Sequence, residues 1–139
     1  MRDWIDLPGL ARWSDAVLLF TRVATGIFLV DGVLDNILSS ERMAEFVAFL
    51  SANGFPMPGF WAPFSVYTQF AIGTGLILGL LTRWAALGLI VTFVVGIVMV
   101  HLNQSLREIW PALALVAIGA ILATHGAGRW SLDAWLARR

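Results

Sequence analysis

Four long apolar stretches, separated by short polar segments, fill most of this 139-residue chain. They cover residues 16–38, 63–81, 84–102 and 109–124. Each approaches the ~20 apolar residues needed to cross a hydrocarbon core ~30 Å thick. Only 13% of the residues are charged, against about 25% in soluble domains. We therefore expect an all-α integral membrane protein, in which residues 1–139 form a single four-helix transmembrane domain with up-down topology.

Tryptophan and arginine positions support these limits and suggest an orientation. Five of the seven tryptophans lie at span ends, as in an aromatic belt: Trp13, Trp61, Trp84, Trp110 and Trp130. Trp4 and Trp135 lie outside the spans, where they could rest on the interface. The arginines on the side of the two termini are Arg2, Arg12, Arg83, Arg129, Arg138 and Arg139, and those on the other side are Arg42 and Arg107. The positive-inside rule then predicts that the N and C termini are cytoplasmic.

Two short helices are expected outside the spans. Residues 41–52 follow a possible serine cap, Ser39 or Ser40. Their apolar residues recur at i, i+3, i+4 and i+7, namely Met43, Phe46, Val47 and Leu50. This amphipathic helix should lie across the outer end of the bundle as a lid. Residues 131–139 place apolar residues beside Arg138 and Arg139, which predicts an interfacial helix on the inner surface.

Polar residues inside the spans form the best lead to function, because ionisable groups at bilayer depth are costly. With 1.5 Å of rise per residue, Asp31 lies ~22 Å and Asp35 ~28 Å beyond the start of the first span. Gln69 lies ~9 Å below the outer end of the second span, and His101 ~26 Å along the third. The four side chains should therefore meet in a polar layer in the outer third of the membrane.

Several chemistries fit such a layer. It could relay protons, since His titrates near neutrality. It could hydrogen-bond the carbonyl groups of a quinone, with Tyr67 nearby on the second span. It could bind a hard divalent cation, but the set lacks a fixed ligand motif, so no metal site is predicted. The plain alternative is that these groups only meet water at the interface.

Arg22, His125 and the small residues of the second span lead to more specific predictions. Arg22 could snorkel to the head groups or anchor an anionic ligand or acidic partner. His125 should lie across the bilayer from His101, which excludes a haem shared between them. Ala71, Gly75 and Gly79 repeat at four-residue spacing and predict a helix-packing stripe.

Composition excludes several classes of function. The chain has no cysteine, which removes disulfides, thiol catalysis and cysteine-ligated metal clusters. Its formal net charge is zero, so no nucleic-acid partner is expected. We expect no intrinsic cofactor. The expected partners are the lipid bilayer and either other membrane or redox subunits or further copies of the chain.

An ordered set of short motifs resembles the DoxX family of small four-helix bacterial membrane proteins. The resemblance covers residues 20–139. Its motifs are Arg22-x3-Gly26, Asp31-Gly32, Phe49-Leu50-x3-Gly54-x-Pro56, Gly73, Gly79-Leu80-x-Thr82-Arg83-x-Ala85-Ala86 and Gly126-x-Gly128-Arg129-x-Ser131-Leu132-Asp133. The sequence departs from the family pattern at Asp31 and Asp35, where His-Gly-x-x-Lys is common, and at Gln69, where Glu is common. These departures favour a changed ligand or an accessory role.

The resemblance implies a bacterial inner-membrane protein linked to redox chemistry, because a related subunit belongs to thiosulfate:quinone oxidoreductase. The leading hypothesis is a membrane subunit of a quinone-linked oxidoreductase, with the polar layer contacting quinol or a partner and a quinone as the possible bound ligand. A structural or assembly subunit without chemistry is the alternative. A carrier for protons or small solutes is the third hypothesis.

Overall fold

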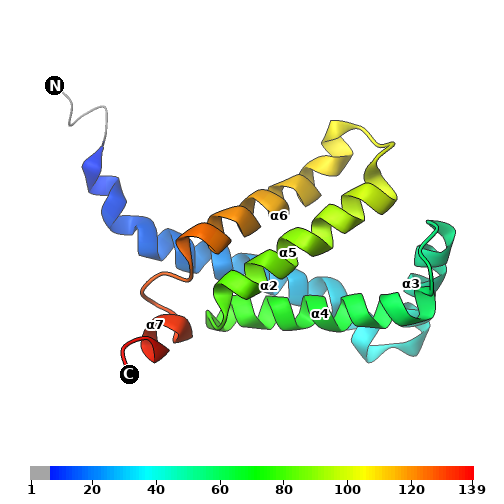
Figure 1. Ribbon diagram of the computed structural model, residues 1–139, viewed down its shortest axis with the longest axis horizontal. Coiled ribbons are helices and arrows are strands. Elements are labelled where there is room, and N and C mark those ends of the chain that lie inside the picture. The colour runs from blue at the N-terminus through cyan, green and yellow to red at the C-terminus, as the bar shows by residue number, and fades with distance from the viewer. Residues whose placement is uncertain (1–6) are drawn as a thin grey trace.

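The computed structural model describes residues 7–139, and every regular element in that range is helical (Figure 1). The elements are η1 (Pro8–Trp13), α2 (Ser14–Leu38), α3 (Ser40–Ala52), α4 (Pro58–Leu78), α5 (Thr82–Gly96), η2 (Ile97–His101), α6 (Leu106–His125) and α7 (Leu132–Leu136). The predicted all-α class is confirmed. Arg2 and Trp4, which enter the sequence prediction, lie outside the described residues.

Helices α2 and α4 pack closely along their length (Figure 1). They cross where Gly26 meets Gly73, and the missing side chains allow the contact. A Cβ atom on Gly26 would stand 2.6 Å from the Gly73 carbonyl oxygen, and one on Gly73 would stand 2.8 Å from the Gly26 carbonyl oxygen. This is a small-residue crossing of the kind that lets transmembrane helices approach closely.

Helices α5 and α6 form a second packed pair, which joins the first through α4. At the α7 end the two pairs lie together, and they diverge toward the end that carries α3 (Figure 1). The closest-packed core lies between them and consists of Leu29, Ile72, Leu76, Ala86, Leu89 and Leu122.

Within residues 7–139, three helical segments are long and apolar enough to cross a membrane: Pro8–Leu38, Thr82–His101 and Leu106–His125. Helix α4 is not among them. It has 21 residues and carries no charged side chain, so its polar residues are what lower its hydropathy. These include Ser65, Tyr67, Thr68 and Gln69.

Two boundaries differ from the sequence prediction in ways that affect the site. Helix α4 begins at Pro58, five residues before the expected start of the second span, because proline suits the first turn of a helix. Gln69 therefore lies about 16 Å from the start of α4, near its middle and not near its outer end. The last turn of the third span is a π-helix over Ile97–His101, which apolar periodicity does not distinguish from an α-helix.

Candidate functional site

A polar node occupies the α7 end of the molecule, and Arg22 lies at its centre. The Arg22 side chain is 1% exposed, and its Nη2 donates to the Trp130 carbonyl oxygen at 2.7 Å. Its Nε and Nη1 are buried and have no partner among the described residues. The guanidinium packs against Gly79, where a Cβ atom would overlap it. Arg22 thus lies inside the protein, against a backbone carbonyl, and does not extend to the surface.

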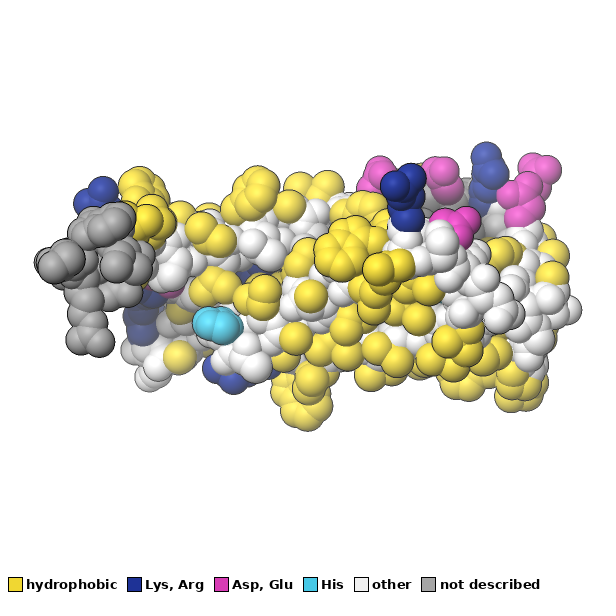
Figure 2. Space-filling model, turned by 90° about the horizontal axis from the view of Figure 1, so that it is seen from above, with side chains coloured by type: hydrophobic (Ala, Val, Ile, Leu, Met, Phe, Trp, Pro, Cys, Tyr) yellow, Lys and Arg dark blue, Asp and Glu magenta, His cyan; other side chains and the backbone are white. Residues whose placement is uncertain are grey.

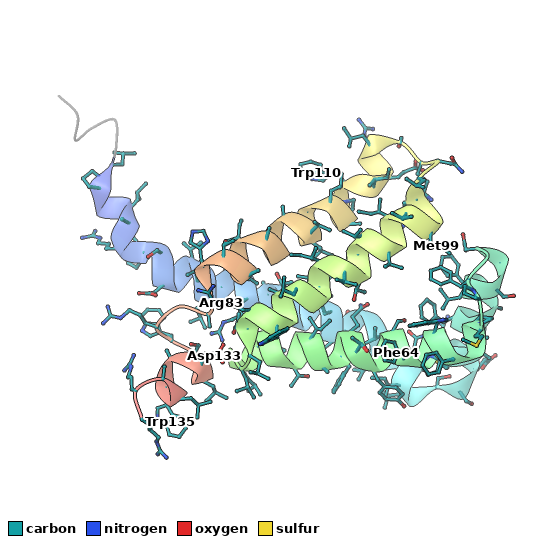
Figure 3. All side chains as sticks on the ribbon, viewed as in Figure 1. Phe64, Arg83, Met99, Trp110, Asp133 and Trp135 are labelled. Atoms are coloured by element: carbon teal, nitrogen blue, oxygen red, sulfur yellow. The ribbon has the colours of Figure 1, made fainter. Side chains whose placement is uncertain are left out.

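Asp133 of α7 ties the C-terminal segment to the turn between α4 and α5 (Figure 3). Its two carboxylate oxygens accept from the backbone N–H groups of Leu81 and Thr82, at 2.7 and 2.9 Å. Its own N–H donates to the Gly79 carbonyl oxygen at 2.8 Å. A carboxylate at this position accepts hydrogen bonds from the free N–H groups at the start of α5, and its negative charge interacts favourably with the positive end of the α5 dipole.

A second carboxylate fastens the same segment to the start of α2. The Arg129 N–H donates to Asp15 Oδ1 at 3.0 Å. Nearby, Arg83 Nη1 donates to the Ala123 carbonyl oxygen at 3.2 Å. The node therefore joins α2, the α4–α5 turn, the end of α6 and the segment around α7 through hydrogen bonds between residues far apart in sequence.

A separate cavity of about 350 Å³ lies between α3, α4 and the far end of α5, where the two helix pairs diverge. Its lining is mainly aromatic and aliphatic. The aromatic members are Phe46, Phe49, Phe55, Trp61, Phe64 and Phe93, and Figure 3 shows Phe64 projecting from α4 on this side. Trp61 and Phe64 meet edge to face with centroids 5.5 Å apart. Residues of the predicted lid helix, Phe46, Phe49 and Leu50, form one wall.

Two of the predicted polar residues, Gln69 and His101, line this cavity together. His101 is the last residue of the π-helix η2, and π-helical turns occur frequently at functional sites. Its Nδ1 is hydrogen-bonded to Gln104 Oε1, which leaves Nε2 as the second ring nitrogen. Ser65, Thr68 and Thr92 add hydroxyl groups to the lining.

The structure does not bring the other candidates into the cavity. Asp31 and Asp35 are exposed on α2, and Tyr67 is exposed on α4 outside the lining. His125 lies on α6 at the node end, where it lines a groove together with Arg83 and Asp133.

The predicted packing stripe does not form one face within the bundle. Ala71 is exposed, Gly75 faces the α4–α5 turn, and Gly79 cradles Arg22. The α2–α4 contact uses Gly73 instead.

Sequence reasoning did not bring together two groups of residues. The aromatic wall of the cavity comes from three separate segments, and of its members only Phe49 lies in a motif. Asp133, Thr82 and Gly79 occur in the motifs behind the family resemblance, but only their proximity in space shows that they form one node. The signals available in the sequence were the Gly-x2-Thr and Ser-Leu-Asp motifs and an arginine, Arg22, within the first apolar stretch.

A helical bundle with segments long and apolar enough to span a membrane, a polar node at one end and an apolar cavity at the other defines a small helical membrane protein. The DoxX family model matches residues 17–102, and the chain belongs to the DoxX family. No curated protein and no solved structure matches the chain.

Proposed function

We propose that the chain is a membrane subunit of a quinone-linked oxidoreductase complex, and that its cavity receives a quinol head group. The observation that carries this proposal is the placement of Gln69 and His101 in one largely apolar, aromatic cavity. At about 350 Å³, the cavity falls within the range of small-molecule sites, which are mainly apolar with a few convergent polar groups.

The lining suits the chemistry of this ligand. A quinone presents two carbonyl oxygens and a quinol two hydroxyls, so the site needs both donors and acceptors. The Gln69 amide supplies both, and the His101 imidazole, whose Nδ1 donates to Gln104 Oε1, supplies an acceptor at Nε2. The aromatic rings of Trp61 and Phe64 offer surfaces on which a planar ring can pack. His101 is also a suitable acceptor for a proton released when a quinol is oxidised, while the electrons pass to a redox subunit of the complex.

The proposal includes α4 as a fourth transmembrane span. Its length of 21 residues corresponds to about 31 Å, which matches the hydrocarbon core. Its polar residues Ser65, Thr68 and Gln69 face the cavity, so they lower the hydropathy of α4 without facing lipid. The chain then crosses the membrane four times in an up-down arrangement.

The distribution of charge supports cytoplasmic termini in a bacterial inner membrane. Within residues 7–139, the node end carries the basic residues Arg12, Arg22, Arg83, Arg129, Arg138 and Arg139 and the acidic residues Asp15 and Asp133. The α3 end carries the basic residues Arg42 and Arg107 and the acidic residues Asp35, Glu41, Glu45 and Glu108. The cavity accordingly opens toward the outer side.

Binding of decylubiquinone to purified protein tests the proposal, with Gly96→Leu as the decisive variant. Gly96 lines the cavity, and an added Cβ meets no atom within 4 Å, so leucine should fill the cavity without strain. Gly59→Leu is the matched control, because Gly59 is equally open but lies outside the lining.

We expect the wild-type protein and Gly59→Leu to bind decylubiquinone equally, and Gly96→Leu to lose binding while remaining folded. His101→Ala and Gln69→Leu should each weaken binding about tenfold, the effect of one lost hydrogen bond. Undiminished binding by Gly96→Leu would show that the cavity is not the site. Absence of binding by the wild-type protein would favour the structural or assembly role instead.

A further inference from the structure

Two carboxylates project from the outward face of α2. The buried residues of α2 include Leu29 and Val33, and Asp31 lies about 200° around the helix from Leu29. Asp35 follows at i+4 on the same side and is also exposed. No described residue forms an ion pair with either carboxylate. Figure 2 shows acidic side chains gathered over one end of the molecule.

Two contacts between α2 and α4 fix the depth of Asp31. A Cβ atom on Gly32 would lie 3.9 Å from Gln69 Nε2, so Gly32 is level with the middle of α4. The Gly26–Gly73 crossing gives the same result. Asp31 lies about 7.5 Å along α2 from that crossing, which places it level with Thr68 and about 15 Å from the start of α4. Asp31 is therefore near the middle of the membrane, and Asp35 is about 6 Å farther out.

An exposed carboxylate at this depth distinguishes α2 from an ordinary lipid-facing helix. Helix α5 and the turn η2 that follows it also have an exposed face outside the cavity, but its members Leu87, Val94 and Val98 are all apolar. Such a face is compatible with lipid. A charged side chain at mid-membrane is costly, and in membrane proteins it almost always faces protein or a water-filled cavity and pairs with another group.

We infer that the Asp31 face of α2 binds a transmembrane helix of another subunit that carries an arginine or lysine level with Asp31. The members of the Asp31 face are Val17, Phe20, Ala24, Ile27, Asp31, Leu34, Asp35 and Leu38. Ala24 allows a partner helix to approach closely. The inference rests on the transmembrane placement of α2 and α4 proposed above, and it does not depend on occupation of the cavity.

Charge complementarity favours a partner helix with a cationic side chain over a second copy of this chain. A parallel pair of α2 helices would bring four aspartates together, and no basic residue lies on the Asp31 face to compensate them. A partner with one cationic side chain at mid-depth would neutralise a carboxylate and satisfy its hydrogen-bonding capacity. The partner class is thus a single helix, mainly apolar, with one buried cation.

A designed peptide provides the probe. We would reconstitute the full chain in phosphatidylcholine vesicles with a 23-residue Leu/Ala helix that carries one central Lys, and measure association by energy transfer between fluorescent labels. The same helix with a central Leu is the reference. We expect about tenfold tighter association with the Lys helix, and loss of that preference in Asp31→Asn. Asp31 makes no contact that folding needs, so this variant should remain folded.

The remaining arms separate this inference from other outcomes. Gly96→Leu, which tests the cavity, should bind the Lys helix as well as the wild-type protein does. Because the chain has no cysteine, Ile27→Cys and the α5 control Leu87→Cys report self-association by disulfide cross-linking. Equal binding of both peptides, or an unchanged preference in Asp31→Asn, would overturn the inference. Efficient self-cross-linking through Ile27→Cys but not Leu87→Cys would overturn it in favour of a homo-oligomer.

Discussion

Replacing Gly79 by alanine should destabilise the protein by more than the cost of placing alanine at a positive φ, because the new side chain would also collide with Arg22. Gly79 has a φ of +67°, and an L-residue pays about 1–2 kcal/mol in this left-handed region. Its added Cβ would also overlap the Arg22 guanidinium and come within 2.6 Å of Ser131 Cβ. Moving the guanidinium breaks its bond to Trp130, which costs about 1.5–3 kcal/mol more. The expected loss is about 2.5–5 kcal/mol.

Gly54→Ala is the matched control for this experiment. Gly54 has a φ of +78°, but nothing lies within 4 Å of its ideal Cβ position. Alanine there carries the backbone strain without the collision. At about 3 °C per kcal/mol for a chain of this length, we expect Tm to fall by about 3–6 °C for Gly54→Ala and by about 8–15 °C for Gly79→Ala.

The assay is thermal unfolding in detergent, followed by the fluorescence of the seven tryptophans. A third variant, Arg22→Met, removes the guanidinium. Adding Gly79→Ala to Arg22→Met should lower Tm by less than Gly79→Ala lowers it in the wild-type protein, because the two changes share one contact and only the contact with Ser131 remains. Equal Tm values for Gly79→Ala and Gly54→Ala would refute the close packing of Arg22 on Gly79.

Two further stability predictions follow from the hydrogen bonds and the helix crossing. Asp133→Asn replaces one carboxylate acceptor by an amide NH2, so either Leu81 or Thr82 loses its bond, and the same melting assay should show a fall of about 5–9 °C. Asp15→Asn is the control, because it keeps the one oxygen that accepts from the Arg129 N–H, and it should lower Tm much less. Similar falls in Tm for the two variants would contradict the role of Asp133 as an acceptor of two hydrogen bonds. Gly73→Leu should force α2 from α4 and abolish the monodisperse peak in size-exclusion chromatography, whereas Ala71→Leu, on an exposed site, should leave it unchanged.

The helices themselves could be predicted from the sequence because apolar length and tryptophan position are local signals. The end of the first span at Leu38 agrees with the structure, and the predicted lid helix forms as α3 with the Ser39 side chain accepting from the Arg42 N–H. The start of α4 was predicted five residues too late, since Pro58, Gly59 and Pro63 interrupt the apolar run. That error placed Gln69 too close to the outer end.

The site could be predicted only in part, because depth along a helix is local information and rotation about it is not. The sequence placed Asp31 and Gln69 near one level, and the Gly32–Gln69 contact agrees with that. It did not show that Asp31 points away from α4. That direction depends on which face α2 buries, and Gly26 decides this through its contact with Gly73.

The polar node also determines when this protein can complete its fold during synthesis. Arg22 belongs to the first long helix, while the carbonyl that receives its hydrogen bond, at Trp130, and the carboxylate beside it, at Asp133, are translated more than 100 residues later. Until those residues arrive, α2 must reside in the membrane with its cation unsatisfied. The C-terminal segment can therefore dock only late in synthesis, and a nascent chain stopped before Trp130 would leave Arg22 without its hydrogen-bond acceptor.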